Sequence, residues 1–178
     1  EDGVVCGLEV VREVFWHMSD EIEMDFFAAE GAWVPQGTVV AELRGPLAPM
    51  LSGERVALNL LQRMSGTATM AHEYVREAAR GGTGRVVDTR KTTPLHRSLE
   101  KAAVRAGGAF NHRFALFDGV LIKDNHIVAA GGLTAAVKAA RAHIHHLMRV
   151  EVEVESLTEL REALDAGADV ILLDNMND

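Results

Sequence analysis

A basic, hydroxyl-rich segment stands out in an otherwise acidic chain. Residues 88–97 read DTRKTTPLHR and contain Arg90, Lys91, His96 and Arg97, although the 178-residue protein has a formal net charge of −8. Arginine offers a planar fork of N–H donors that matches a carboxylate or a phosphate, whereas lysine offers a mobile point charge. The threonines of the segment add hydroxyl donors. The pattern predicts a binding site for a small anion with more than one acidic group.

Polar side chains also follow other short apolar runs. They occupy positions 123–126 and 174–175, and Glu153 and Glu155 lie in a further run. In α/β barrels and open α/β sheets, the carboxyl ends of the strands build the site. One polar strand end could simply begin a loop. Repetition at four strands is hard to explain by packing, and it predicts a shared site.

The cationic and acidic groups at these strand ends suggest two kinds of ligand. The side chains that could hold a compact anion are Arg90, Lys91, His112, Arg113 and Lys123, with hydroxyl donors from Thr89, Thr92 and Thr93. For His112 taken alone, a structural hydrogen bond is as good an explanation as contact with a ligand. Glu153 and Asp174 could share a hard cation such as Mg²⁺, with water and substrate phosphates completing its coordination. They could instead accept ribose hydroxyl groups or pair with the lysines.

The first half of the chain predicts a small β-containing domain followed by a helix. Residues 30–45 read as two short strands joined at Pro35-Gln36-Gly37. From Glu54 to about Arg80 the apolar residues keep helical spacing, with Ser52 as a possible N-cap and a possible break at 65–69. We therefore expect a helix that connects two domains.

From Arg85 onward, strands alternate with helices. Ser156 and Glu159 form a capping box. The alternation predicts an α/β fold with parallel strands joined by right-handed crossovers. Four strands cannot close a barrel of the usual eight or so, so we expect either an open sheet or a fragment. The predicted strands are 85–90, 119–125, 149–155 and 169–175, and the predicted helices are 95–106, 133–143 and 156–166.

The composition argues against a membrane protein and against a nucleic-acid-binding protein. Hydrophobic residues make up 48% of the chain, which predicts a sizeable core, and no apolar run approaches the roughly 18 residues of a membrane helix. Cys6 is the only cysteine, so we expect a reducing, cytoplasmic compartment and a buried thiol. A local basic zone on an acidic chain argues against nucleic acid as a partner. We interpret His143, His145 and His146 as part of a loop before a strand rather than as a metal cluster.

Six segments, in this order, resemble the quinolinate phosphoribosyltransferase family, also called nicotinate-nucleotide pyrophosphorylase (carboxylating). The combination of LIKDNH with DTRKTTP is specific. The resemblance implies an N-terminal α+β open sandwich with a connecting helix at 1–82. It also implies the first four βα units of an incomplete parallel α/β barrel at 83–178, with a phosphate-binding loop expected after Asp178. The segments are ERVALNLLQRMSGTAT, DTRKTTP, GGAFNHR, LIKDNHI, VEVEVES and DVILLDNM.

The resemblance also implies a reaction and a set of site residues. The family condenses quinolinate with phosphoribosyl pyrophosphate to give nicotinate mononucleotide, pyrophosphate and CO₂ in de novo NAD synthesis. By this likeness Glu153 and Asp174 serve Mg²⁺ and the ribosyl pyrophosphate, and with Lys123 they form the catalytic set. A homodimer or higher homo-oligomer is implied, with Arg55 contributed across the interface, and no membrane or nucleic acid partner. The implied quinolinate ligands are Arg55, Thr89, Arg90, Lys91, His112, Arg113 and Lys123.

Three positions depart from the family pattern, and two other functions compete. Leu95 stands where the family usually has glycine, Ala109 replaces the third residue of a GGG, and Thr67 replaces the isoleucine of SGIAT. One alternative is the molybdenum-transport-associated paralogue of the same superfamily, which lacks the KDNH segment found here. The other is a non-enzymatic anion-binding module, in which Glu153 and Asp174 would be superfluous.

Overall fold

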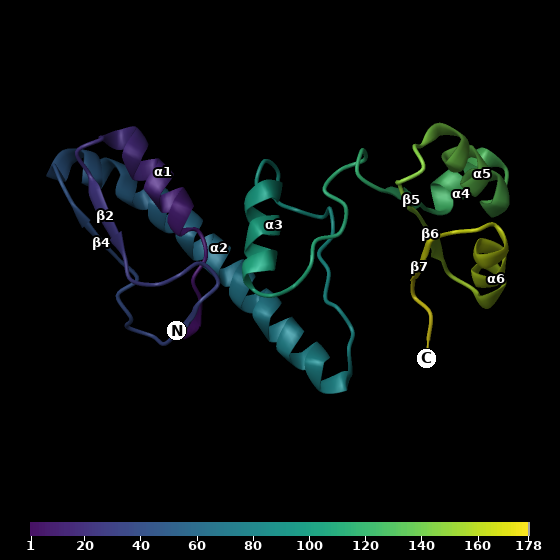
Figure 1. The fold of residues 1–178 in the computed structure, drawn as a ribbon, viewed down its shortest axis with the longest axis horizontal. Coiled ribbons are helices and arrows are strands. Elements are labelled where there is room, and N and C mark those ends of the chain that lie inside the picture. The colour runs from purple at the N-terminus through teal and green to yellow at the C-terminus, as the bar shows by residue number, and fades with distance from the viewer. Residues whose placement is uncertain (178) are drawn as a thin grey trace. The chain divides into compact units, whose positions relative to one another are not determined.

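The computed structural model describes residues 1–177, which form two compact units (Figure 1). The first unit comprises Glu1–His112 and the second Arg113–Asp178. The predicted α/β class is confirmed. The predicted division after residue 82 marks the end of the long helix α2 (Leu47–Gly81) and stays a prediction as a domain boundary.

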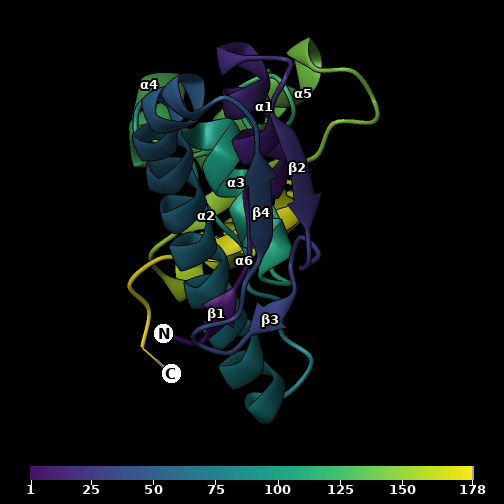
Figure 2. The same cartoon turned by 90° about the vertical axis from the view of Figure 1, so that its left-hand side faces the viewer.

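The first unit contains two short antiparallel strand pairs that pack with helices. In Figures 1 and 2, β2 and β4 run side by side. Buried side chains of α1 and α2, together with Met24 of β2 and Leu43 of β4, form one apolar cluster. The elements are β1 (Gly3–Val4), α1 (Leu8–Met18), β2 (Glu23–Phe26), β3 (Trp33–Val34), β4 (Ala41–Arg44), α2 and α3 (Arg97–Ala106).

The two strands expected within 30–45 exist, but they do not pair with each other. β3 pairs with β1, and β4 pairs with β2. Residues 35–40 separate the two strands, which is longer than the usual hairpin loop of about 2–5 residues. Arg44 of β4 instead reaches Asp25 of β2 at 2.8 Å. The pairing partners therefore come from earlier in the chain.

Helix α1 was not predicted, because its valines favour a strand locally. Leu8, Val11 and Phe15 are buried at helical spacing, so tertiary packing overrides that preference. The helix begins after Gly7, which has a φ of 110°. The carboxylate of Glu30 accepts hydrogen bonds from the backbone N–H groups of Gly7 and Leu8 at 2.8–2.9 Å. It stabilises the positive end of the helix.

Helix α2 runs without a break, and two expectations about it were wrong. It begins at Leu47, so Ser52 lies inside the helix and donates its hydroxyl to the carbonyl of Ala48. The segment 65–69 continues the helix because its hydroxyl groups bond within α2 and to β1. Thr69 Oγ1 donates to Ser65 O and accepts from Val4 N, so the small residues there let β1 pack closely.

The second unit is a three-stranded parallel sheet with helices. The sheet order is β5-β6-β7, as expected for βαβ units (Figure 1). The first strand expected in this half, 85–90, is reduced to an isolated parallel bridge between Val87 and Phe110 in the first unit. The elements are β5 (Val120–Ile122), α4 (Asp124–Ala130), α5 (Leu133–His143), β6 (Val150–Val154), α6 (Leu157–Asp165) and β7 (Val170–Leu173).

The alternating sequence of β6 gives the sheet one apolar face. Val150, Val152 and Val154 are fully buried in a cluster with residues of α5 and α6. Ser156 caps α6 as expected, and accepts from the backbone N–H of Glu159. The reciprocal bond runs from Glu155 N to the Glu159 carboxylate, one residue before the cap. No helix in residues 1–177 combines the length and apolar character needed to cross a membrane.

Cys6 is buried, as expected. Burial and the neighbouring carboxylate of Glu30 raise the pKa of its thiol to about 12. The thiol is therefore protonated near neutral pH and unreactive as a nucleophile.

Replacing Glu30 with glutamine should lower the free energy of unfolding by about 1 kcal/mol, because α1 loses charged hydrogen bonds at its first turn. Urea denaturation followed by circular dichroism measures the change. Glu21→Gln, at an exposed turn, is the matched control and should leave the midpoint unchanged. Equal midpoints for the two variants would show that Glu30 does not stabilise α1.

Candidate active site

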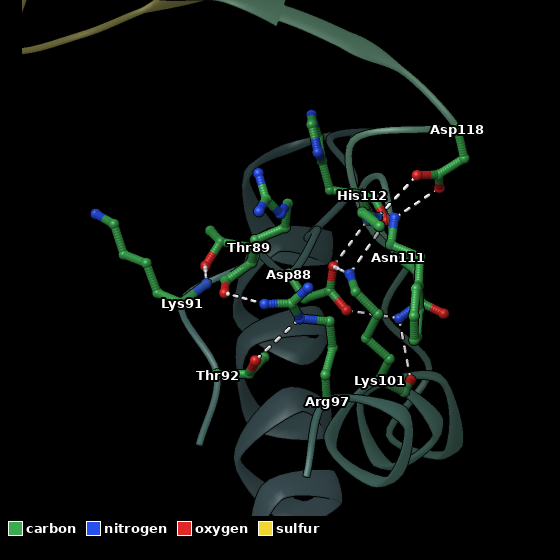
Figure 3. A network of polar contacts seen from close by, with 12 residues as sticks. Asp88, Thr89, Lys91, Thr92, Arg97, Lys101, Asn111, His112 and Asp118 are labelled. Atoms are coloured by element: carbon green, nitrogen blue, oxygen red, sulfur yellow. Dashed lines mark hydrogen bonds and ion pairs between the residues drawn. The ribbon is translucent and has the colours of Figure 1, made fainter. Parts of the chain in front are cut away.

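Asp88 lies at the centre of a buried polar network in the first unit (Figure 3). Its Oδ1 accepts from Lys101 Nζ at 2.6 Å and from the backbone N–H of His112 at 2.8 Å. Its Oδ2 accepts from Asn111 Nδ2 at 2.6 Å. The side chains of Lys101 and Asp88 are 6% and 10% exposed, so the ion pair is shielded from water. The network fixes residue 88 against residues 111–112 and α3.

Helix α3 also holds the basic loop that follows Asp88. Arg97 donates from Nε to Thr92 Oγ1 at 3.2 Å and from Nη2 to the carbonyl of Arg90 at 3.3 Å. Glu100 accepts from the backbone N–H of Thr93 at 3.1 Å. These helix residues and Lys101 share one face, since they lie three and four positions apart. The loop is therefore held along its length by one helix.

Glu100 is itself held in its charged form. It pairs with Arg63 of α2 at 2.6 Å, and Arg63 also donates to Thr93 Oγ1. Burial by itself would raise the pKa of Glu100, but the hydrogen bonds from Arg63 and Thr93 outweigh it and lower the pKa below its ordinary value of 4.5. Two helices thus fix Thr93 through one carboxylate.

The fixed loop presents cationic side chains. Lys91 is exposed and points away from the Asp88 network in Figure 3. Its backbone N–H bonds to Thr89 Oγ1 at 3.0 Å. The Nε of Arg90 is buried and has no hydrogen-bond partner among residues 1–177. Leu95, where the family usually has glycine, is fully exposed with a φ of 66°, so the left-handed turn forms without glycine.

Three further predicted residues lie together on one face of the sheet in the second unit. Val152 and Val154 of β6 point into the core, so Glu153 points to the opposite face. Lys123 Nζ reaches Glu153 Oε2 at 2.5 Å. Asp174 directly follows β7, and strand alternation from Leu172, which pairs with Glu153, directs it to this face. Its carboxylate accepts from Asn175 Nδ2 at 3.0 Å. The carboxyl ends of β5, β6 and β7 therefore bring one cation and two carboxylates to the same face.

Two more predicted ligands, Arg113 and Arg55, contact residues outside the Asp88 network and outside the group around Glu153. Arg113 donates from Nη1 to the carbonyl of Gly119 at 2.9 Å. Arg55 is exposed on α2 beside Glu54, at 3.8 Å. Because the two units are described separately, their convergence in one site stays a prediction. The first unit holds Arg55, Thr89, Arg90, Lys91 and His112, and the second holds Arg113, Lys123, Glu153 and Asp174.

Sequence reasoning missed the residues that hold the site in place. It assigned no role to Lys101, Glu100 or Arg97, although their spacing on the predicted helix 95–106 was a usable signal. It also missed His126, whose Nδ1 accepts from the backbone N–H of Lys123 at 2.9 Å. These residues bond backbone groups or side chains of other segments, so their types alone do not reveal them.

Within residues 1–177, no group of three His, Cys, Asp or Glu side chains is placed to hold a metal ion. His143 ends α5 and bonds the carbonyl of Ala139, whereas His145 and His146 lie in the loop before β6, where His145 accepts from the N–H of Leu147.

Comparison with known proteins identifies the family. Residues 1–65 match the model of the quinolinate phosphoribosyl transferase N-terminal domain, and residues 67–178 match that of the C-terminal domain. The chain belongs to the quinolinate phosphoribosyl transferase family. The two matched regions meet inside α2.

Relatives of this phosphoribosyl transferase family are similar over nearly all of the chain. A probable nicotinate-nucleotide pyrophosphorylase (carboxylating) of Bacillus subtilis is 49% identical over 98% of the chain. The nicotinate-nucleotide pyrophosphorylase (carboxylating) of Homo sapiens is 47% identical over 97%. The chain spans 60% and 58% of these two relatives. A solved nicotinate-nucleotide pyrophosphorylase from Francisella tularensis matches with a TM-score of 0.95 at 40% identity, over 99% of this chain and 62% of that one.

Glu100→Gln should destabilise the protein at neutral pH and have less effect in acid. A lowered folded-state pKa means that the stabilisation is present well above pH 4.5 and is lost as pH falls through the folded value. Thermal unfolding from pH 7 to pH 3 measures this, and the gap between the two midpoints should narrow progressively as pH falls below 4.5. Glu21→Gln should track the natural protein throughout. A gap for Glu100→Gln that is as large at pH 3 as at pH 7 would contradict the assignment.

Proposed function

We propose that this chain belongs to an enzyme that converts quinolinate and phosphoribosyl pyrophosphate to nicotinate mononucleotide, pyrophosphate and CO₂. The observation that carries the proposal is the basic loop at 89–91, held in place by α3, in a chain of this family. The Lys123, Glu153 and Asp174 group at the strand ends of the second unit supports it. Neither feature is required for packing, because these side chains lie outside the apolar clusters.

The basic loop suits a pyridine dicarboxylate. Quinolinate carries two carboxylates on adjacent ring carbons, and a guanidinium can bind a carboxylate through two parallel hydrogen bonds. Arg90 and Lys91 supply charge from the first unit, and Arg113 and Lys123 supply it from the second. Thr89 and His112 add neutral donors. Together they would fix the ring and present its nitrogen to the second substrate.

The acidic pair suits the ribose end of the reaction. The bond between the ribose carbon and pyrophosphate breaks, which leaves positive character on that carbon, and the ring nitrogen donates its lone pair to form the new bond. Carboxylates such as Glu153 and Asp174 stabilise that developing charge. The pyridinium ring then accepts the electron pair of the carbon–carboxylate bond as CO₂ leaves, and a proton takes the vacated position. Lys123 pairs with Glu153 and would connect the two substrates.

Magnesium fits the donor set of this site. Glu153 of β6 and Asp174, directly after β7, would supply oxygen ligands, and Mg²⁺ usually takes one or two carboxylates together with water and substrate phosphates. When bound, Mg²⁺ would neutralise the charge of the departing pyrophosphate. Glu153 and Asp174 would hold it.

The same proposal includes a cytoplasmic homodimer. Arg55 would reach the site of the partner subunit, because it lies on an exposed stretch of α2 beside apolar side chains that a monomer would leave in water. Leu51 and Val56 are 60% and 53% exposed there. Exposed apolar patches of this kind mark interaction surfaces. Cys6 is the only cysteine among the 178 residues and has no internal disulfide partner, which suits a reducing compartment.

An activity assay tests the proposed function on the natural full-length polypeptide that contains residues 1–178. We expect nicotinate mononucleotide and CO₂ in equal amounts, only when both substrates and Mg²⁺ are present. EDTA should abolish the reaction, and excess Mg²⁺ should restore it. Quinolinate binding in a calorimeter without product formation would instead indicate an anion-binding module.

Subunit mixing tests the shared site. Arg55→Ala and Arg90→Ala should each reduce activity by about 10- to 150-fold, the range for losing a charged hydrogen bond. If Arg55 acts across a two-fold interface, random mixing of the two variants should restore about a quarter of the natural activity, because half of the dimers would have one intact site. Lack of recovery, with exchange shown by native mass spectrometry, would place Arg55 outside the partner's site.

A further inference from the structure

Lys101 is buried, although burial of a charge is costly. Among residues 1–177 it is the one polar or charged residue that is buried. Taking an ammonium out of water costs free energy that its partners seldom exceed, so a buried ion pair is weak support for stability alone. The position of the pair in the fold offers another reason for its presence.

The ammonium of Lys101 joins two segments that carry predicted ligands. It donates to Asp88 Oδ1 at 2.6 Å, next to the basic loop, and to the carbonyl of His112 at 3.1 Å. The backbone N–H of His112 returns to the same Asp88 oxygen at 2.8 Å. Both backbone polar groups of His112 are thus bonded to the ion pair, which sets the place of His112 relative to Asp88.

The loop on the other side of Asp88 is fixed by the same helix. Arg97 holds the carbonyl of Arg90, and Glu100 holds the N–H of Thr93. Because α3 also carries Lys101, one rigid element controls the positions of Arg90 and of His112. Loss of the ammonium would uncouple the two segments while α3 itself stayed packed through Ala103.

We propose that Lys101 is a positioning residue of the quinolinate site, which sets the distance between His112 and the cations of the 89–91 loop. The inference rests on the proposed function and deepens it. Lys101 is buried and acts through Asp88 and His112 rather than by touching substrate. Small misplacements of binding groups reduce activity strongly, so its loss should weaken quinolinate recognition more than recognition of phosphoribosyl pyrophosphate.

The main test is a double variant, Lys101→Met with Asp88→Leu, in the natural full-length polypeptide, which removes both the ammonium and the oxygen that accepts from the His112 N–H. Removing both charges avoids an unpaired buried ion and favours retained folding. We expect the KM for quinolinate to rise about 10-fold or more, on the scale of a lost charged hydrogen bond, while the KM for phosphoribosyl pyrophosphate changes less than about two-fold. Lys138→Met, at an exposed position on α5, should change neither.

A second readout does not depend on turnover. The His112 amide should be protected from hydrogen exchange in the natural protein and lose that protection in the double variant, while the amide of Val152 in β6 stays protected. If the double variant does not fold, Asn111→Ala removes one bond to Asp88 and leaves the ion pair. It should raise the quinolinate KM by a smaller factor of about two to five.

The outcomes separate the two proposals. A folded double variant with an unchanged quinolinate KM, or with unchanged protection at His112, overturns the role of Lys101 and leaves the function standing. An equal rise in both KM values would indicate a general structural role and also overturn it. A natural protein that neither binds quinolinate nor forms product overturns the proposed function itself, while loss of His112 protection would still support the coupling through Lys101.

Discussion

The buried pair of Lys101 and Asp88 is the constraint on which the first unit's candidate site depends. An ammonium and a carboxylate that are withdrawn from water must have their hydrogen bonds satisfied, because an incomplete set costs more than an apolar core would. The chain meets this need with the side chain of Asn111 and with both backbone groups of His112. Three segments distant in sequence are therefore fixed at one point, and the basic loop begins directly after it.

In the second unit, strand alternation explains both the apolar core and the position of the charged side chains. The sequence VEVEVE sends three valines to the helices α5 and α6 and sends the glutamates to the other face. Lys123 and Asp174 follow the same period on the neighbouring strands, so the register that buries the core also brings the charged groups together. A slip of one residue would exchange the faces and lose both at once.

The sequence predicted those parts of the fold that depend on local signals. The capping serine of α6, the helix 133–143 and the alternation of β6 each lie within a few residues, and all three formed as expected. Helix α1 and the pairing of β4 with β2 depend on burial against distant residues, which composition does not reveal. The strand-end cations could be found for the same local reason. For Lys101 only its helical spacing was visible locally, because its partners come from two other segments.

The distribution of ion pairs explains how an acidic chain can offer a cationic site. Near the basic loop, Asp88 is occupied by Lys101, and Glu100 by Arg63. These carboxylates therefore bond structural cations and are not available to Arg90 and Lys91, neither of which forms an ion pair within the described part of the chain. The net charge of −8 describes the whole molecule, but the potential that an anion at the loop would experience is dominated by unpaired charges within about 8 Å at physiological salt. Local pairing, rather than overall charge, thus leaves the cations of the loop available to an anion.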